Sequence, residues 1–88
     1  MKTVVLINSD TNEFVKGFAK MFSTASNTYL TGSEIEMEDS AIPAIGDTIM
    51  LEFPNDEGQL LAKMYTVEKR VFDFLRDRTV LKIKNENV

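Results

Sequence analysis

The side chains of this sequence that could do chemistry are carboxylates, amides, hydroxyls and bases, because the chain contains neither Cys nor His. Without a thiol or an imidazole, disulfides, thiolate nucleophiles, imidazole acid–base catalysis and most structural zinc sites are excluded. The chemistry that remains is the binding of hard cations by oxygen, acid–base work by paired carboxylates, and the binding of phosphate by Lys and Arg.

The first candidate site is a group of oxygen ligands near the N-terminal end. Asn8, Asp10 and Asn12 have the i, i+2, i+4 spacing of calcium-binding loops. Such loops need Gly at the sixth position and a bidentate Glu at the twelfth, where this chain has Glu13 and Ala19. We therefore predict no metal site here and interpret Asp10 as the cap of a following helix.

The second candidate is a row of carboxylates formed by Glu34, Glu36 and Glu38, which alternate with Ile35 and Met37. A strand would place the three carboxylates on one face, where they could attract a divalent cation or a basic partner. A solvent-facing strand surface explains them equally well. Carboxylate pairs also hydrolyse glycosides, but a chain of this size offers little room for the required cleft. We predict no catalytic residue, no cofactor and no small-molecule substrate.

The third candidate combines basic and aromatic side chains near the C-terminal end, a mixture typical of surfaces that bind single-stranded nucleic acid. The chain has a net charge of −4, with eight carboxylates and no base in residues 33–57. The same bases could alternatively balance those carboxylates across neighbouring strands. The candidate binding residues, for nucleic acid or for a protein, are Phe72, Phe74, Arg70, Arg76, Arg78, Lys82 and Lys84.

The two C-terminal Phe residues pose a problem for the expected strand over residues 60–75. Alternation places Tyr65, Val67 and Val71 inward, which leaves Phe72 and Phe74 on the polar side. Three outcomes would resolve this: a bulge near Lys69 that shifts the register, coverage by the N-terminal aromatic side chains, or coverage by another chain. In the last case the two rings are part of a contact surface.

These residues must be positioned by a small fold, which at 88 residues we expect to be a single domain over residues 1–88. Residues 2–8 are rich in β-branched side chains and predict a strand buried on both faces. Asp10 or Thr11 can cap a helix. Over residues 14–22, the spacing of Phe14, Phe18 and Phe22 favours a helix, although Gly17 weakens it and the even-numbered positions also fit a strand. Residues 23–33 predict an irregular connection.

Four alternating segments follow, over residues 34–38, 47–53, 60–75 and 78–84. The sequence from Pro54 to Gly58 supplies a turn between the second and third of them, and Arg76-Asp77 supplies a tight connection before the last. The predicted order is β-α-β-β-β-β. The fold class is α+β, a small antiparallel sheet or barrel with one N-terminal helix.

A short motif starts the strand at residues 47–53. In Pro43-Ala-Ile-Gly46-Asp47-Thr-Ile49, Pro fixes φ before a turn and Gly can supply a positive φ directly ahead of the strand. This motif, with the segments Tyr65-Thr66-Val67 and Val80–Ile83, resembles small SH3-like barrel proteins, including short uncharacterised bacterial or phage proteins. The resemblance covers residues 42–84 and implies a barrel that binds peptide or RNA, with no shared catalytic residue. It leaves open whether the barrel closes or a helix caps the sheet.

The apolar runs are too short for a membrane helix, since the longest is Val4–Ile7. We find no secretory signal and expect a cytoplasmic protein without membrane contact. No nucleophile–base pair, Gly-rich phosphate loop or metal cluster is evident. The leading functional prediction is a non-enzymatic interaction module that binds a protein partner, or itself as a homodimer, through a sheet face or edge. The alternative is single-stranded nucleic-acid (RNA) binding by the basic C-terminal strands.

Overall fold

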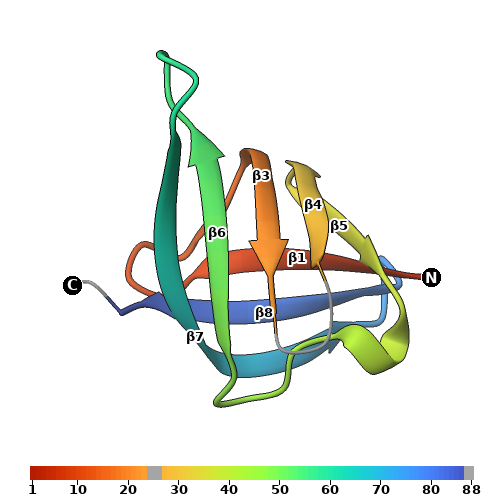
Figure 1. Ribbon diagram of the computed structural model, residues 1–88. Helices are drawn as coiled ribbons and strands as arrows, with labels where there is room; N and C mark the ends of the chain where they lie inside the picture. The colour runs from red at the N-terminus through yellow and green to blue at the C-terminus, as the bar shows by residue number, and fades with distance from the viewer. Residues whose placement is uncertain (24–26, 87–88) are drawn as a thin grey trace.

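A computed structural model of the chain describes residues 1–23 and 27–86 (Figure 1). Their regular structure consists of strands and a single short 3-10 helix, η1, at Asp39–Ala41. The strands are β1 (Lys2–Asn8), β2 (Glu13–Phe14), β3 (Gly17–Phe22), β4 (Asn27–Gly32), β5 (Glu34–Met37), β6 (Thr48–Pro54), β7 (Leu60–Asp73) and β8 (Arg78–Asn85).

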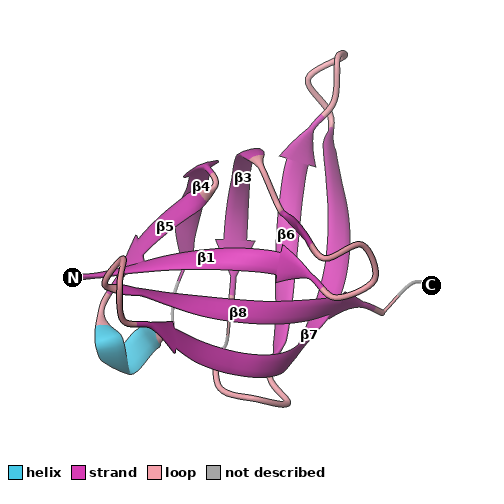
Figure 2. Ribbon diagram, turned by 180° about the vertical axis from the view of Figure 1, so that it is seen from behind, coloured by secondary structure: helices cyan, strands magenta, loops and turns pink. Residues whose placement is uncertain are grey.

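The strands close into a barrel. The order around it is β1-β5-β4-β3-β6-β7-β8, and β8 pairs back with β1 (Figures 1 and 2). The β1–β8 pairing is parallel and the other pairings are antiparallel. The two-residue β2 continues the edge of β1 beyond β5, because it pairs with Ile7 and Asn8. The predicted β-rich barrel is thus confirmed, and the α+β order with an N-terminal helix is wrong.

The predicted helix over residues 14–22 is replaced by β3 and the end of β2. Gly17, the first residue of β3, has a φ of 122°, which no helix accommodates. Within β3, Ala19 and Met21 are fully buried and alternate with outward-facing Phe18 and Phe22. The strand alternative for the even-numbered positions was therefore the right one, because the period of burial is two.

The polar segment after β1 forms a turn and caps no helix. The Asn8 Oδ1 accepts a hydrogen bond from the Asp10 N–H at 3.0 Å, and the Asn12 N–H donates to the Asn8 carbonyl at 2.7 Å. Asn12 has a φ of 57°, which Asn tolerates better than most residues. The interpretation of Asp10 as a helix cap is wrong, because the chain reverses at this position and returns along β1.

The irregular connection predicted over residues 23–33 is wrong for residues 27–32, which form a strand. Residues 24–26 lie outside the described part of the chain. Residues 27–32 form β4, whose Leu30 is fully buried opposite Ala19. Gly32, with a φ of 67°, then turns the chain into β5. Tyr29 and Leu30 are adjacent rather than alternating within this run of Thr, Ser and Asn, which was too weak a signal for a strand.

The other predicted strands are confirmed, β1 with the predicted bounds. Val4 and Leu6 point into the barrel, whereas Val5 is fully buried although it lies outside the core cluster. Gly46 has the expected positive φ, 93°, and its N–H donates to the carbonyl of Val67. The core inside the barrel comprises Val4, Leu6, Ala19, Met21, Leu30, Ile35, Met37, Ile42, Ile49, Leu51, Tyr65, Val67, Leu81 and Ile83.

Strand β7 joins the two sides of the barrel. It pairs with β6 as far as Thr66 and with β8 from Tyr65 onward, and Figure 2 shows it bending between them. The register shifts between Val67 and Lys69, so a bulge near Lys69, one of the three alternatives given for this strand, is present. Beyond the bulge Val71 pairs with Val80 and is half exposed, which contradicts its predicted inward position.

Candidate functional site

An exposed apolar surface lies on the outer side of β4, β3, β6 and β7. Tyr29, Lys20, Glu52 and Ala62 are successive cross-strand partners and form one row of it. Along β3 and β6 the neighbours of this row, Ala19, Met21 and Leu51, belong to the core, whereas Leu61 and Lys63 beside Ala62 on β7 are exposed. The polar Asn27 and Thr31 lie on β4 at the ends of the two rows beside this row. We define the aromatic face by the apolar and charged outward residues of the three rows, which are Phe18, Lys20, Phe22, Tyr29, Met50, Glu52, Pro54, Leu60, Ala62 and Met64.

The strongest feature of the aromatic face is a stacked pair of rings. The centroids of Phe18 and Tyr29 are 5.5 Å apart with an interplanar angle of 23°. These side chains remain 58% and 51% exposed, respectively. The Lys20 Nζ lies 4.9 Å from the centroid of the Phe22 ring. Because paired strands on both sides fix this arrangement, the rings are presented without loss of backbone freedom on binding.

A second apolar surface is the tip of the β7–β8 hairpin, where two predicted site residues lie. Phe72 and Phe74 form an edge-to-face pair with centroids 6.1 Å apart and are 51% and 84% exposed. Leu75 beside them is 90% exposed. The predicted bulge therefore shifts the register without burying the two rings.

The bases at this tip are engaged within the chain. The Arg76 Nη1 and the Arg78 Nε donate to the same Asp73 Oδ2, at 3.2 and 3.1 Å. Desolvation acts to raise the pKa of Asp73, but the hydrogen bonds from both Arg side chains outweigh it and hold the pKa below its usual value. The Arg78 guanidinium also lies 5.4 Å from the centroid of Phe14.

The remaining predicted bases lie on other parts of the β7–β8 ribbon. Arg70 pairs with Leu81 and so shares the barrel-facing side of the ribbon with Phe72. Lys82 and Lys84 lie on its outer side. The structure thus divides the predicted set among two sides of the ribbon and its tip. One continuous basic and aromatic platform is not formed.

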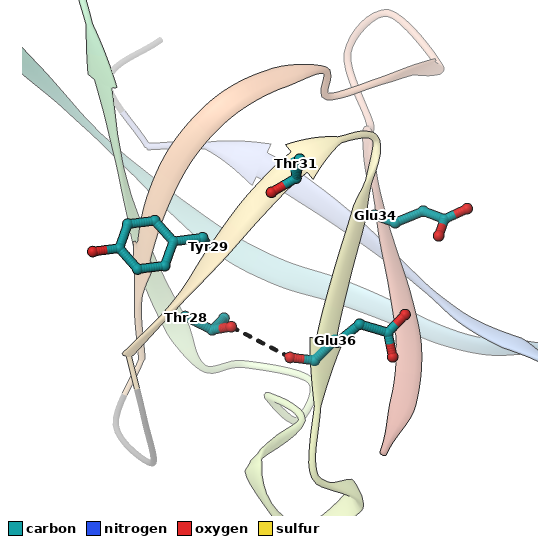
Figure 3. A pocket seen from close by; sticks show the side chains of 5 residues that line it. All are labelled: Thr28, Tyr29, Thr31, Glu34 and Glu36. Carbon is teal, nitrogen blue, oxygen red and sulfur yellow. Dashed lines mark hydrogen bonds between the residues drawn. The ribbon is translucent and has the colours of Figure 1, made fainter.

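The acidic row lies beside a groove between β4 and β5, which pair only at Thr31 and Glu34 (Figure 3). The groove has a volume of about 360 Å³. The Thr28 hydroxyl donates to the Glu36 carbonyl across it at 3.3 Å. Figure 3 shows the Glu34 and Glu36 side chains directed away from the Tyr29 ring, and the Glu36 Oε1 accepts from the Thr3 hydroxyl at 2.9 Å. The two carboxylates therefore do not converge on the groove.

Asn8, Asp10 and Asn12 serve the turn described above. Within residues 1–23 and 27–86, no group of three or more carboxylates is placed to hold a metal ion. In the same part of the chain, no helix has the length and apolar character needed to cross a bilayer.

The residues of the aromatic face were not predicted as a site. Phe18 and Phe22 were assigned to a helix, and Tyr29 to an irregular connection. The even spacing of the Phe residues was the available signal for an outward strand face. Nothing in the sequence indicated that β6 would lie beside β3, which is what adds Met50 and Glu52 to the face.

Comparison of the chain with known protein families, with characterised proteins and with solved structures finds no match. The resemblance to SH3-like barrels therefore stays a prediction, and the function rests on the surface described here.

Proposed function

We propose that the chain is a non-enzymatic interaction module that binds a protein through the aromatic face. The observation that carries this proposal is the stacked, half-exposed pair of Phe18 and Tyr29 on a four-stranded outer surface. Large contiguous apolar patches on a protein surface mark contact sites, since water contact with them is unfavourable. Aromatic side chains are common anchors in such contacts.

The neighbouring side chains support the same proposal. Met50 and Met64 are paired at one end of the face, and Pro54 and Leu60 at the other. Met adapts its shape to an apolar partner, and the flanking Pro and Leu extend the apolar area. The aromatic face is preferred to the β7–β8 tip because its side chains are held on neighbouring strands, whereas Phe74 lies in a turn.

Photo-cross-linking in the native cells tests the proposal. Tyr29 is replaced by p-benzoylphenylalanine, which keeps an aromatic ring at that position, and the same replacement is made at Glu57 as an exposed control in the β6–β7 turn. We expect protein adducts from position 29, none from position 57, and loss of the adducts when Phe18→Ser is added. The absence of protein adducts at position 29, or an adduct yield that is unchanged when Phe18→Ser is added, would overturn the proposal.

Single-stranded nucleic-acid binding is the second candidate, favoured by the neighbouring rings of Phe72 and Phe74 beside basic residues. Pairing of Asp73 with two Arg side chains reduces the charge offered to phosphate there. Fluorescence polarisation with single-stranded RNA tests it at low and moderate salt. Affinity that falls steeply with salt, and that is lost in a variant combining Phe72→Ser with Arg70→Ala, which share one side of the ribbon, would favour this candidate.

A further inference from the structure

Two opposite charges lie side by side at the centre of the aromatic face without pairing with each other. Lys20 and Glu52 are direct cross-strand partners on β3 and β6, and both are half-buried. The Lys20 Nζ lies over the ring of Phe22 instead. Within the described part of the chain, the ion pairs all involve Asp73. The face therefore offers one cation and one anion to whatever covers it.

The two halves of the face differ in the shape of their side chains. On β3 and β4 the apolar groups are the rings of Phe18, Phe22 and Tyr29. On β6 and β7 they are Met50, Pro54, Leu60, Ala62 and Met64. The boundary between the halves runs between β3 and β6, and this boundary separates Lys20 from Glu52.

We infer that a second copy of the chain covers this face in a twofold-symmetric dimer, an inference that rests on the function proposed above. The twofold axis lies in the interface, parallel to β3 and β6 and midway between them. Rotation about it exchanges the positions of β3 and β6, because the two strands are equally distant from the axis. Lys20 then lies opposite Glu52 of the partner subunit, and the same pair occurs twice in one interface.

The same rotation places each half of the face on the other half. Phe22 lies opposite Met50 of the partner subunit, because these residues are cross-strand partners within one chain. Tyr29, at the outer end of its row, lies opposite Ala62 of the partner subunit at the other end. Large rings thus meet small or flexible side chains, which is the complementarity that close packing of two sheets requires.

Charge complementarity favours a copy of the chain over an unrelated protein. Because Lys20 and Glu52 are cross-strand partners, the copy presents an anion opposite each cation and a cation opposite each anion, at the centre of the interface. A different protein would need a matching pair of charges at the same spacing. Face-to-face packing also places both Phe18–Tyr29 pairs, one from each subunit, within the interface.

Charge exchange at this pair tests the dimer. In Lys20→Glu the centre of the interface holds only carboxylates, and in Glu52→Lys only cations, so each variant should dimerise at least about tenfold more weakly than the unmodified chain. A mixture of the two variants restores opposite charges and should form a heterodimer. The doubly exchanged chain should dimerise again. The controls, Lys16→Glu and Glu57→Lys, change the same charges at exposed positions outside the face and should leave dimerisation unchanged.

Sedimentation velocity over a dilution series gives the association state, and circular dichroism confirms that each variant is folded. A monomeric unmodified chain at the highest concentration overturns the dimer, as does a mixture of the two variants that stays monomeric while both are folded. In either case, adducts between Tyr29-substituted chains and a different protein would leave the proposed function standing. Adducts between two copies of the chain support both proposals, and the absence of any adduct at the face contradicts both.

Discussion

At the scale of single residues, Met21 and Phe18 lie on one strand but face opposite sides of the barrel wall. Met21 is fully buried, so Met21→Ala should lower the free energy of unfolding by about 2–5 kcal/mol, through lost apolar contact and a residual cavity. Phe18 is 58% exposed, so Phe18→Ser should cost less than about 1 kcal/mol. Urea unfolding at low protein concentration, where self-association does not contribute, measures both. Equal costs would place Phe18 in the core and remove it from the contact face.

Because Asp73 pairs with Arg76 and Arg78, we expect the β7–β8 hairpin to lose stability in acid. The folded-state pKa of Asp73 is lowered, so the carboxylate stabilises the hairpin above its unfolded pKa of about 3.9, and this stabilisation is lost as the pH falls through the folded-state value. An NMR titration of the carboxyl carbon should give a midpoint below the ordinary Asp value. Asp73→Asn should abolish the acid-dependent loosening of the hairpin.

The matched control for this titration is Asp77→Asn in the same turn. Asp77 has a φ of 49°, which Asn also tolerates, so the turn is kept while one carboxylate is removed. The titration of Asp73 should then be unchanged. A midpoint for Asp73 at or above the ordinary value would show that the two Arg side chains do not hold it.

At the scale of elements, the sequence predicted those strands whose apolar residues alternate in a way that fits a strand but not a helix. Ile35 and Met37 alternate with Glu, and Ile49 with Leu51, so β5 and β6 were found from pattern alone. The spacing of Phe14, Phe18 and Phe22 fits both a period of two and a helical turn. Pairing of β3 with β4 and β6 selects the strand over the helix. These partner strands lie elsewhere in the sequence, so the local spacing of the Phe residues could not reveal them.

The bulge in β7 is the element that fixes which side chains reach the core beyond Val67. Glu68 is the extra residue of the bulge, because Val67 lies opposite Ile83 and Lys69 lies opposite Lys82. Deleting Glu68 therefore leaves these pairings and the sides of the residues beyond them unchanged, and it removes the acceptor of the Ser9 hydroxyl. We expect a loss of about 0.5–1.5 kcal/mol in the free energy of unfolding, the contribution of one hydrogen bond. Deleting Glu57 from the exposed β6–β7 turn is the control. A loss of several kcal/mol by urea unfolding for the Glu68 deletion alone would contradict this assignment of the extra residue.

At the scale of the whole molecule, the candidate site arises from strand order, which explains why sequence analysis did not find it. Residues 17–22 and 48–54 are separated by two strands along the chain, yet they lie side by side and bring Lys20 next to Glu52. The C-terminal candidates were found because Phe72 and Phe74 are neighbours in sequence. Strict alternation placed Arg70 and Phe72 together on the outer, polar side of the strand, whereas the bulge turns both to the barrel-facing side.

The barrel wall is weakest where β4 meets β5, since these strands pair only at Thr31 and Glu34. By contrast, β7 and β8 pair along most of their length. Hydrogen exchange followed by NMR should therefore show faster exchange for amides that face the β4–β5 groove than for amides between β7 and β8, because fewer ladder bonds must open.

Thr28→Val makes this prediction specific to the groove. It removes the hydroxyl that donates to the Glu36 carbonyl and keeps the shape of the side chain. A hydrogen bond of this kind contributes about 0.5–1.5 kcal/mol, so exchange beside the groove should accelerate by up to about tenfold. Amides between β7 and β8 should be unaffected, because the rest of the ladder is intact. Equal acceleration around the whole barrel would mean that the wall opens as one unit and that β4 and β5 do not form a separate seam.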